Sequence, residues 1–261
     1  SAEADAFNGK GGGDTITGNG GNDTIEGGEG TDTAVYAGAW IGYDVTNGGS
    51  TVADTNTANG DDGTDTLLNV ERLSFNGVIV SAADAVNDAP IGVNDSNTGS
   101  ELVEDGNSAA SGNVLANDTD ADLALGLGET LTVTGARTGL ESAGGDFGQL
   151  EGPLELGGTY GTLSIAVDGT WSYALNQSRA ETQALEAGDT GIDAFTYQVT
   201  DAHGLTDTAQ LRLTITGAAE PGDNEAPVVA KPLPDVTSAE DQAVSFRDPT
   251  PLKAGRHGFF Q

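Results

Sequence analysis

Single apolar positions recur at a fixed interval through the first part of the chain. Four of them lie nine residues apart: Phe7, Ile16, Ile25 and Ala34. Four aspartates keep the same interval, two positions earlier: Asp5, Asp14, Asp23 and Asp32. Glycine-rich segments fill the spaces between them, and glycine adopts positive φ angles without steric cost. Each nine-residue unit is therefore predicted to form a tight turn followed by a short strand.

The nine-residue interval ends after Tyr36, where a different pattern begins. Apolar and polar residues alternate around residues 43–45 and again over residues 70–80. Alternation with a period of two is typical of strands with one buried face, so we expect a few antiparallel strands that cap the first block. Residues 60–67 fit one further nine-residue unit, in which Asp65 either binds a cation or only shapes a turn.

The second block also alternates with a period of two. Five such segments cover residues 131–133, 163–167, 171–175, 195–199 and 211–215. Asp168-Gly169 separates the second segment from the third, and Asp-Gly between two alternating runs is a strong signal for a β-hairpin. Several short strands without intervening helices predict a β-sandwich.

Four aromatic residues lie on these alternating segments: Trp171, Tyr173, Phe195 and Tyr197. An aromatic platform that binds a sugar is one interpretation of this cluster. Aromatic residues at strand spacing more often fill the core or form cross-strand pairs. We therefore expect these four side chains in the core of the sandwich.

Two nearly identical linkers enclose the second block, at residues 87–90 (Asn-Asp-Ala-Pro) and 224–227 (Asn-Glu-Ala-Pro). Matching linkers mark a module of a tandem array. The predicted division has four parts: a first domain over residues 1–86, the sandwich over 87–223, the start of a further module over 224–246, and an atypical tail over 247–261. The tail holds three of the nine basic residues.

The charge of the chain narrows the possible partners. It has 41 acidic and 9 basic residues, a formal net charge of -32 and a pI of about 4.1. Nucleic acid and anionic membranes need a basic surface, so both are excluded as partners, and divalent cations are the natural counter-ions. An acidic chain can simply be disordered, but the regular glycine period and 36% hydrophobic residues favour an ordered, β-rich chain.

The sequence also indicates how its small cores are stabilised. It has no cysteine, so bound cations are expected in the stabilising role that disulfides have in many extracellular domains. No apolar run reaches the roughly 18 residues that a membrane-spanning helix needs. Because no signal peptide opens the chain and it contains no methionine, we expect a piece of a longer polypeptide.

The units over residues 5–36 resemble the RTX (repeats-in-toxin) nonapeptide family. The resemblance implies a parallel β-roll in which two nonapeptides make one coil, so that equivalent turns stack every eighteen residues. This arrangement places Asp14 against Asp32 and Asp5 against Asp23. The resemblance also implies calcium bound between the turns, and export of the chain through a type I secretion channel.

Stacked turns have a spacing that suits calcium. Parallel strands lie about 4.7 to 4.9 Å apart, so an ion midway between them is about 2.4 Å from ligands above and below. Ca–O distances are about 2.3 to 2.6 Å, whereas Mg²⁺ prefers about 2.1 Å and rigid octahedral geometry. The four aspartates and the turn carbonyls are therefore the predicted Ca²⁺ ligands. The alternative is that these aspartates only cap turns, although aligned carboxylates would repel one another without an ion.

The second block resembles the bacterial cadherin-like modules known as VCBS repeats. Glu104-Asp105-Gly106 and residues 112–122, 161–173 and 195–204 carry the resemblance. It implies calcium at the junction between modules, held by a Glu-Asp pair, an Asp-x-Asp motif and a carboxyl-amide pair. The corresponding residues here are Glu104 and Asp105, Asp120 and Asp122, and Asn87 with Asp88, with Asp201 as a further candidate. The alternative is that these acidic loops are solvated surface.

No catalytic motif stands out. The chain has two histidines, His203 and His257, and neither a nucleophile motif nor a phosphate-binding loop, so we expect no enzyme within these residues. The predicted fold is all-β: a parallel β-roll with an antiparallel cap, followed by an immunoglobulin/cadherin-like β-sandwich. The predicted function is that of a calcium-binding, non-catalytic segment of a secreted bacterial surface adhesin or biofilm-type protein. It would act outside the cell on host-cell or biofilm surface components. The alternative is the non-catalytic part of a secreted hydrolase or toxin.

Overall fold

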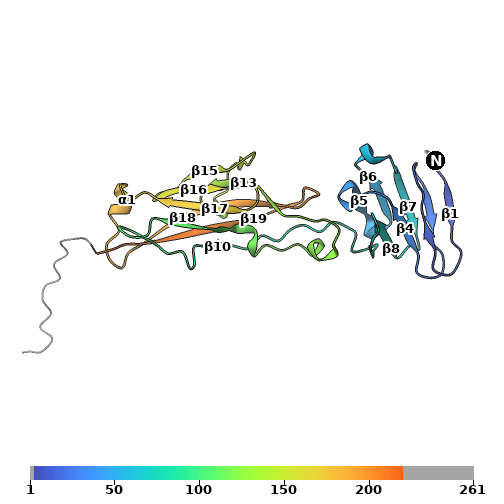
Figure 1. The fold of residues 1–261 in the computed structure, drawn as a ribbon, viewed down its shortest axis with the longest axis horizontal. Coiled ribbons are helices and arrows are strands. Elements are labelled where there is room, and N and C mark those ends of the chain that lie inside the picture. The colour runs from blue at the N-terminus through green and yellow to red at the C-terminus, as the bar shows by residue number, and fades with distance from the viewer. Residues whose placement is uncertain (1–2, 220–261) are drawn as a thin grey trace, which may run out of the picture. The chain divides into compact units, whose positions relative to one another are not determined.

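The structure, a computed structural model, describes residues 3–219, and its regular secondary structure is mainly β-strand (Figure 1). Its one α-helix among these residues is the single turn α1 (Ala180–Gln183). No helix in the described part is long and apolar enough to cross a membrane. The predicted third module over 224–246 and the tail over 247–261 lie outside the described residues.

The nine-residue units form coils of a parallel β-roll. Its first four strands are β1 (Ala6–Asn8), β2 (Thr15–Ile16), β3 (Thr24–Glu26) and β4 (Thr33–Tyr36). Strand β1 pairs in parallel with β3, with Phe7 opposite Ile25, and β2 pairs in parallel with β4, with Ile16 opposite Ala34. The expected stacking of equivalent turns every eighteen residues is therefore confirmed.

A third coil continues the roll after an insertion. Strands β7 (Thr64–Leu68) and β8 (Arg72–Phe75) pair in parallel with β3 and β4. Leu67 lies opposite Ile25, and Leu73 lies opposite Ala34. The unit predicted over residues 60–67 is thus part of the roll.

Antiparallel strands cap the roll, as the alternating pattern predicts. They are β5 (Tyr43–Thr46), β6 (Thr51–Asp54) and β9 (Val78–Ser81). Strands β5 and β6 form a hairpin, β6 pairs with β7, and β9 pairs with β8. Ile25, Leu67 and Leu73 are at most 3% exposed, and Tyr36, Tyr43 and Phe75 pack beside them.

Left-handed backbone explains why glycine recurs in the turns of the roll. The fourth turn position has φ values of 106°, 121° and 143° at Gly12, Gly21 and Gly30. Residues other than glycine rarely adopt this region. A side chain at this position would strain the turn, and at Gly30 a Cβ atom would also clash with the carbonyl oxygen of Gly12 in the stacked coil.

The second block is a β-sandwich of two sheets. One sheet contains β10 (Asp95–Ser96), β11 (Leu102–Val103), β13 (Thr132–Thr138), β14 (Gly148–Gln149), β18 (Thr190–Thr200) and β19 (Thr206–Thr216). The other contains β12 (Ala109–Asn113), β15 (Leu154–Gly157), β16 (Gly161–Ile165) and β17 (Thr170–Leu175). Strands β16 and β17 form the predicted hairpin, whose turn includes Gly169 with φ of 77°.

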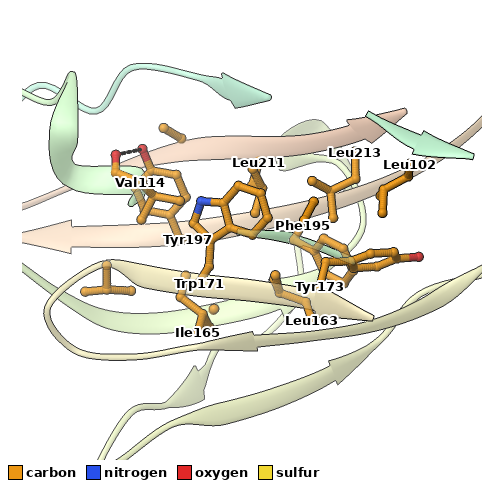
Figure 2. Packing of buried hydrophobic residues seen from close by; sticks show 14 of the residues in the cluster. Leu102, Val114, Leu163, Ile165, Trp171, Tyr173, Phe195, Tyr197, Leu211 and Leu213 are labelled. Carbon is orange, nitrogen blue, oxygen red and sulfur yellow. Dashed lines mark hydrogen bonds between the residues drawn. The ribbon is translucent and has the colours of Figure 1, made fainter. Parts of the chain in front are cut away.

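The four aromatic residues singled out in the sequence lie in the core of this sandwich (Figure 2). Trp171 is 5% exposed, and Tyr173, Phe195 and Tyr197 are each 1% exposed. They pack with aliphatic residues of both sheets, such as Leu163. Large buried aromatic surfaces make a major contribution to the stability of such a core. The prediction of a core role is therefore confirmed, and no surface remains on these rings for a sugar.

Candidate calcium sites

Stacked acidic residues connect the three coils of the roll. The main-chain amide of Asp14 donates to Asp32 Oδ1 at 2.7 Å, and the amide of Asp5 donates to Asp23 Oδ1 at 2.7 Å. The third coil repeats this contact. There the amide of Asp23 donates to Asp65 Oδ1 at 2.9 Å, and the amide of Asp32 donates to Glu71 Oε2 at 2.9 Å. We call this series of hydrogen bonds the carboxylate ladder.

The ladder leaves one oxygen of three aspartates without a partner. Oδ2 of Asp14, Asp23 and Asp32 is buried and accepts no hydrogen bond. Asp23 and Asp32 are only 2% and 0% exposed. A buried carboxylate oxygen that nothing compensates is strongly unfavourable. These oxygens are therefore suited to a cation, and Ca²⁺ is the ion that prefers such carboxylate ligands together with main-chain carbonyls.

Glycine main chain lies directly against these oxygens. A Cβ atom at Gly9 would be 2.5 Å from Asp14 Oδ2 and 2.5 Å from the carbonyl oxygen of Gly27 in the next coil. Gly18 and Gly27 have the same relationship to Oδ2 of Asp23 and Asp32. Each carboxylate therefore lies against a turn glycine, and beside Gly9 and Gly27 a main-chain carbonyl oxygen of the stacked coil is close as well.

Asp65 differs from the three aspartates above. Its Oδ1 accepts from Asp23, and its Oδ2 accepts from the Tyr36 hydroxyl at 3.1 Å. Burial raises the pKa of Asp65 to about 6. Because both oxygens have partners, the geometry favours the second of the two roles considered for Asp65, that of shaping the turn.

A second group of acidic residues gathers where the linker enters the sandwich. The amide of Asp88 donates to Asp122 Oδ2 at 2.8 Å, and the amide of Asp122 donates to Asp120 Oδ1 at 2.8 Å. The side-chain amide of Asn87 donates to Asp201 Oδ2 at 2.7 Å. The structure therefore brings together five of the residues expected at a module junction.

Glu129 joins this group, although no sequence motif marks it as a ligand. Its Oε1 accepts from the main-chain amides of Ala202 at 2.8 Å and of Thr130 at 2.7 Å. Its Oε2 accepts no hydrogen bond and lies 3.8 Å from His203 Nδ1. Glu129 stands outside the Asp-x-Asp and Glu-Asp patterns, and nothing local distinguishes it among the other acidic residues.

Four buried oxygens in this region lack hydrogen-bond donors: Asn87 Oδ1, Asp120 Oδ2, Asp122 Oδ1 and Glu129 Oε2. We call these four residues the junction cluster. Burial, together with the negative charges of Asp120, Asp88 and Glu129, raises the pKa of Asp122 to about 6. A divalent cation would offset both the missing partners and this repulsion.

Acidic side chains by themselves do not complete a metal site. Among the residues the structure describes, no three His, Cys, Asp or Glu side chains converge closely enough to hold one ion. Ca²⁺ takes six to eight oxygen ligands and accepts amide and main-chain carbonyl oxygens. The amide oxygen of Asn87 and turn carbonyls would therefore have to supply part of the coordination shell.

Glu104 and Asp105 lie away from the junction cluster. The amide of Glu104 donates to the carbonyl of Thr216, and Gln183 donates to Glu104 Oε1 at 2.9 Å. Glu104 therefore lies beside the last residue of β19, Thr216, whereas the turn that holds Asp201 directly precedes the first residue of this strand, Thr206. Eleven residues of strand span roughly 30 Å. The expectation that one ion is shared by Asp88, Glu104, Asp105 and the Asp120-x-Asp122 loop is therefore corrected.

These features define a calcium-binding β-roll joined to a cadherin-like sandwich. The family described as RTX calcium-binding nonapeptide repeat (4 copies) matches residues 1–34. The family described as bacterial cadherin-like domain matches residues 87–217, half of the chain. The chain therefore belongs to the bacterial cadherin-like domain family and carries RTX repeats before that domain, as the sequence resemblance indicates.

Other comparisons add little. No curated protein matches the chain. One solved structure with similarity is that of a nucleoside hydrolase-related hypothetical protein from Saccharophagus degradans, described as associated with carbohydrate metabolism. It shares 13% sequence identity, and the match covers 64% of this chain and 40% of that one. The TM-score of 0.29 is too low to support an argument.

Proposed function

We propose that this chain is a calcium-folded, non-catalytic segment of a secreted bacterial surface protein of the adhesin or biofilm type. The observation that carries the proposal is the set of three buried Oδ2 atoms, on Asp14, Asp23 and Asp32, that face glycine turns and have no partner. Membership in the two families supports calcium binding, and both families are typical of secreted or surface proteins.

Calcium would supply positive charge between stacked turns. The role of the chain is to hold the carboxylates in register: Oδ1 of Asp23 and Oδ1 of Asp32 are fixed by main-chain amides of the coil before them. Without cations, a chain with a net charge of -32 repels itself and favours expanded states. Binding and folding are then coupled, which suits export of an unfolded chain and folding outside the cell.

The junction cluster is a second proposed calcium site. Three carboxylates and one amide come from one loop of the sandwich and from the linker, and each keeps one buried oxygen without a donor. Asp88 and Asp201 hold this arrangement in place through their bonds to Asp122 and Asn87. The ion would link the linker to the sandwich and restrict the angle between neighbouring modules.

The surroundings of His203 support a non-catalytic role. Its ring lies against Trp40, and its two nitrogens face Glu129 and the carbonyl of Tyr43. The ring packs on Trp40 and Nε2 lies 3.2 Å from the carbonyl oxygen of Tyr43, whereas Nδ1 has no hydrogen-bond partner among the described residues. No serine, threonine or cysteine nucleophile is among the contacts of His203 in the described part of the chain.

The adhesin role rests on modular organisation. The linker at residues 87–90 recurs at residues 224–227 on the other side of the module, which is the organisation of a tandem array. We propose host-cell or biofilm surface components as the partners of such an array. The complete coding sequence tests this proposal, because repeated cadherin-like modules support an adhesin and one adjoining catalytic domain supports a hydrolase or toxin.

Calcium-dependent folding of the roll is tested by far-ultraviolet circular dichroism of the whole chain. We expect added β-sheet signal when chelator is replaced by millimolar Ca²⁺, and a much smaller gain with the same concentration of Mg²⁺. A double variant, Asp14→Asn with Asp32→Asn, should lose most of the gain. Identical folded spectra in chelator and in calcium would overturn the proposal.

A further inference from the structure

One loop of the sandwich connects the junction cluster to the roll. It runs from Asp120 to Glu129 and includes the short 3-10 helix Ala121–Leu125. Asp120 and Asp122 stand at its start and Glu129 at its end, and all three belong to the junction cluster. Gly126 and Gly128, with φ of 71° and 91°, turn the chain at its tip. We call residues 120–129 the docking loop.

The tip of the docking loop packs into the roll. Leu127 is 6% exposed and belongs to the same hydrophobic cluster as the buried side chains of the roll, among them Trp40, Tyr43 and Ala85. Leu125 is partly buried against the same cluster. The hydrophobic core of the first domain is therefore completed by a residue that comes from the second.

A second contact lies beside the first. The His203 ring meets Trp40 edge-on at 4.1 Å between centroids, and His203 Nε2 is 3.2 Å from the carbonyl oxygen of Tyr43. Trp40 Nε1 donates to the carbonyl of Ala85 at 2.8 Å, which fixes the indole ring. Glu129 accepts a hydrogen bond from the main-chain amide of Ala202 and faces His203. One carboxylate therefore connects the docking loop to the turn between β18 and β19 that holds His203.

We propose that cation binding at the junction cluster closes the docking loop and thereby docks the cadherin-like module on the β-roll. The interaction surface consists of Leu125, Leu127 and His203, and its partner is the Trp40 side of the roll of the same chain. This inference rests on the proposed function, because it takes calcium as the ligand of the junction cluster.

Electrostatics gives the reason for the coupling. Asp120, Asp122 and Glu129 carry like charges at the two ends of a short loop, and their unpaired oxygens are buried only while the loop is closed. Without a cation, repulsion favours an open loop, which withdraws Leu127 from the roll. Coupling between two binding events is reciprocal. Contact between Leu127 and the roll must therefore raise the calcium affinity of the junction cluster, although Leu127 is not one of its ligands.

The test compares two leucines of the same loop in the whole chain. Leu127→Ala removes the buried side chain, and Leu123→Ala is the matched control because Leu123 is 44% exposed and outside the roll core. Hydrogen exchange with mass spectrometry is followed during a Ca²⁺ titration, with chelator as the starting point. We expect Leu127→Ala to speed exchange about tenfold in β5, β6 and β9 at saturating calcium. Leu127→Ala should also raise, several-fold, the Ca²⁺ concentration at which the docking loop is half protected from exchange. Leu123→Ala should change neither the exchange rate in the cap nor this concentration.

His203→Ala is a second test, at the neighbouring contact that the sandwich makes with Trp40 of the roll. The His203 side chain lies at the surface of the sandwich and not in its core, so β18 and β19 should stay protected from exchange in this variant. The cap of the roll should exchange faster, as it does in Leu127→Ala. Glu129→Gln should do the same, and should abolish the calcium response of the docking loop.

The outcomes separate the docking proposal from the proposed function. If calcium orders the roll but none of the three variants alters its cap or the calcium midpoint of the loop, the docking proposal is wrong and calcium folding of the roll stands. If calcium protects neither the roll nor the loop in the unmodified chain, the proposed function itself fails.

Discussion

The main-chain amide of Asp14 donates a 2.7 Å hydrogen bond to Oδ1 of Asp32, eighteen residues further along the chain. One oxygen of Asp32 is therefore fixed by the coil before it, while its Oδ2 stays buried without a donor. The same division of roles holds in Asp23, whose Oδ1 accepts from Asp5. Once the coils have stacked, a carboxylate held in this way keeps its free oxygen in a fixed position for an ion.

Asp14 and Asp65 should respond differently to neutralisation. We expect Asp14→Asn to weaken calcium binding by the roll about tenfold, because it removes a charged ligand with an unpaired oxygen. Asp65→Asn should change the affinity by less than about twofold, since both oxygens of Asp65 already accept hydrogen bonds. Calorimetric titration of both variants measures this difference. Equal losses would mean that Asp65 is a ligand.

Two glycines of one turn provide a steric test of the roll. A Cβ atom at Gly9 would lie 2.5 Å from Asp14 Oδ2 and Gly27 O, whereas at Gly11 the nearest atom is 3.7 Å away. Neither residue has a positive φ angle. We expect Gly9→Ala to cost about 2 kcal/mol of unfolding free energy in calcium and Gly11→Ala less than about 0.5 kcal/mol. Urea unfolding at saturating calcium measures both, and a tolerated Gly9→Ala would contradict the turn geometry.

A buried aspartate in the sandwich predicts a specific pH dependence. Burial, together with the charge of Asp118, raises the pKa of Asp95 from 3.8 to about 6. The Tyr197 hydroxyl lies 3.0 Å from Asp95 Oδ2. A raised folded-state pKa means that the stabilising contribution is complete below pH 4 and is lost as the pH rises through 6.

Asp95→Asn should therefore stabilise the sandwich at pH 7 by roughly 1–2 kcal/mol relative to the unmodified chain, allowing for partial solvent screening. At pH 4 the two proteins should be nearly equal in stability. Urea unfolding monitored by Trp171 fluorescence gives both values, with Glu155→Gln on the exposed face of β15 as the control. A difference that does not change with pH would exclude Asp95 as its source.

Not every buried carboxylate is proposed to bind calcium, and Asp193 shows the contrast. Its oxygens accept from Thr159 N at 2.6 Å, Tyr160 N at 3.1 Å and the Tyr173 hydroxyl at 2.5 Å. Asp193→Asn should cost about 2 kcal/mol with or without calcium, because it disrupts bonds within the protein. Asp122→Asn should destabilise the sandwich in calcium only. Unfolding of both variants in calcium and in chelator decides this, and a calcium-dependent effect of Asp193→Asn would contradict the assignment.

Local periodicity accounts for what could be predicted from the sequence. The stacking of Asp14 on Asp32 depends only on an interval that repeats along the chain, and the hairpin around Gly169 depends on a short turn signal. The core positions of Trp171 and Tyr197 follow from alternation in single strands. In each case, neighbouring residues contain the information that determines the structure.

Residues that meet through the tertiary fold could not be predicted in this way. Glu129 reaches the junction cluster because β13 and β18 place its loop beside the Asp201 turn, and no short motif encodes that proximity. Glu104 carries a family motif, but β19 places it at the far end of the sandwich from Asp122. In a chain with 41 acidic residues, only the fold shows which carboxylates face each other.

The insertion between the second and third coils has a consequence for the order of folding. Asp23 meets Asp65 across 42 residues, whereas Asp5 meets Asp23 across 18. Closing the longer loop costs roughly 0.8 kcal/mol more chain entropy. The β5–β6 hairpin lies within this loop and pairs directly with β7, so its formation shortens the search that the third coil must make. We therefore expect the hairpin to form before the third coil and to serve as the edge on which β7 is added.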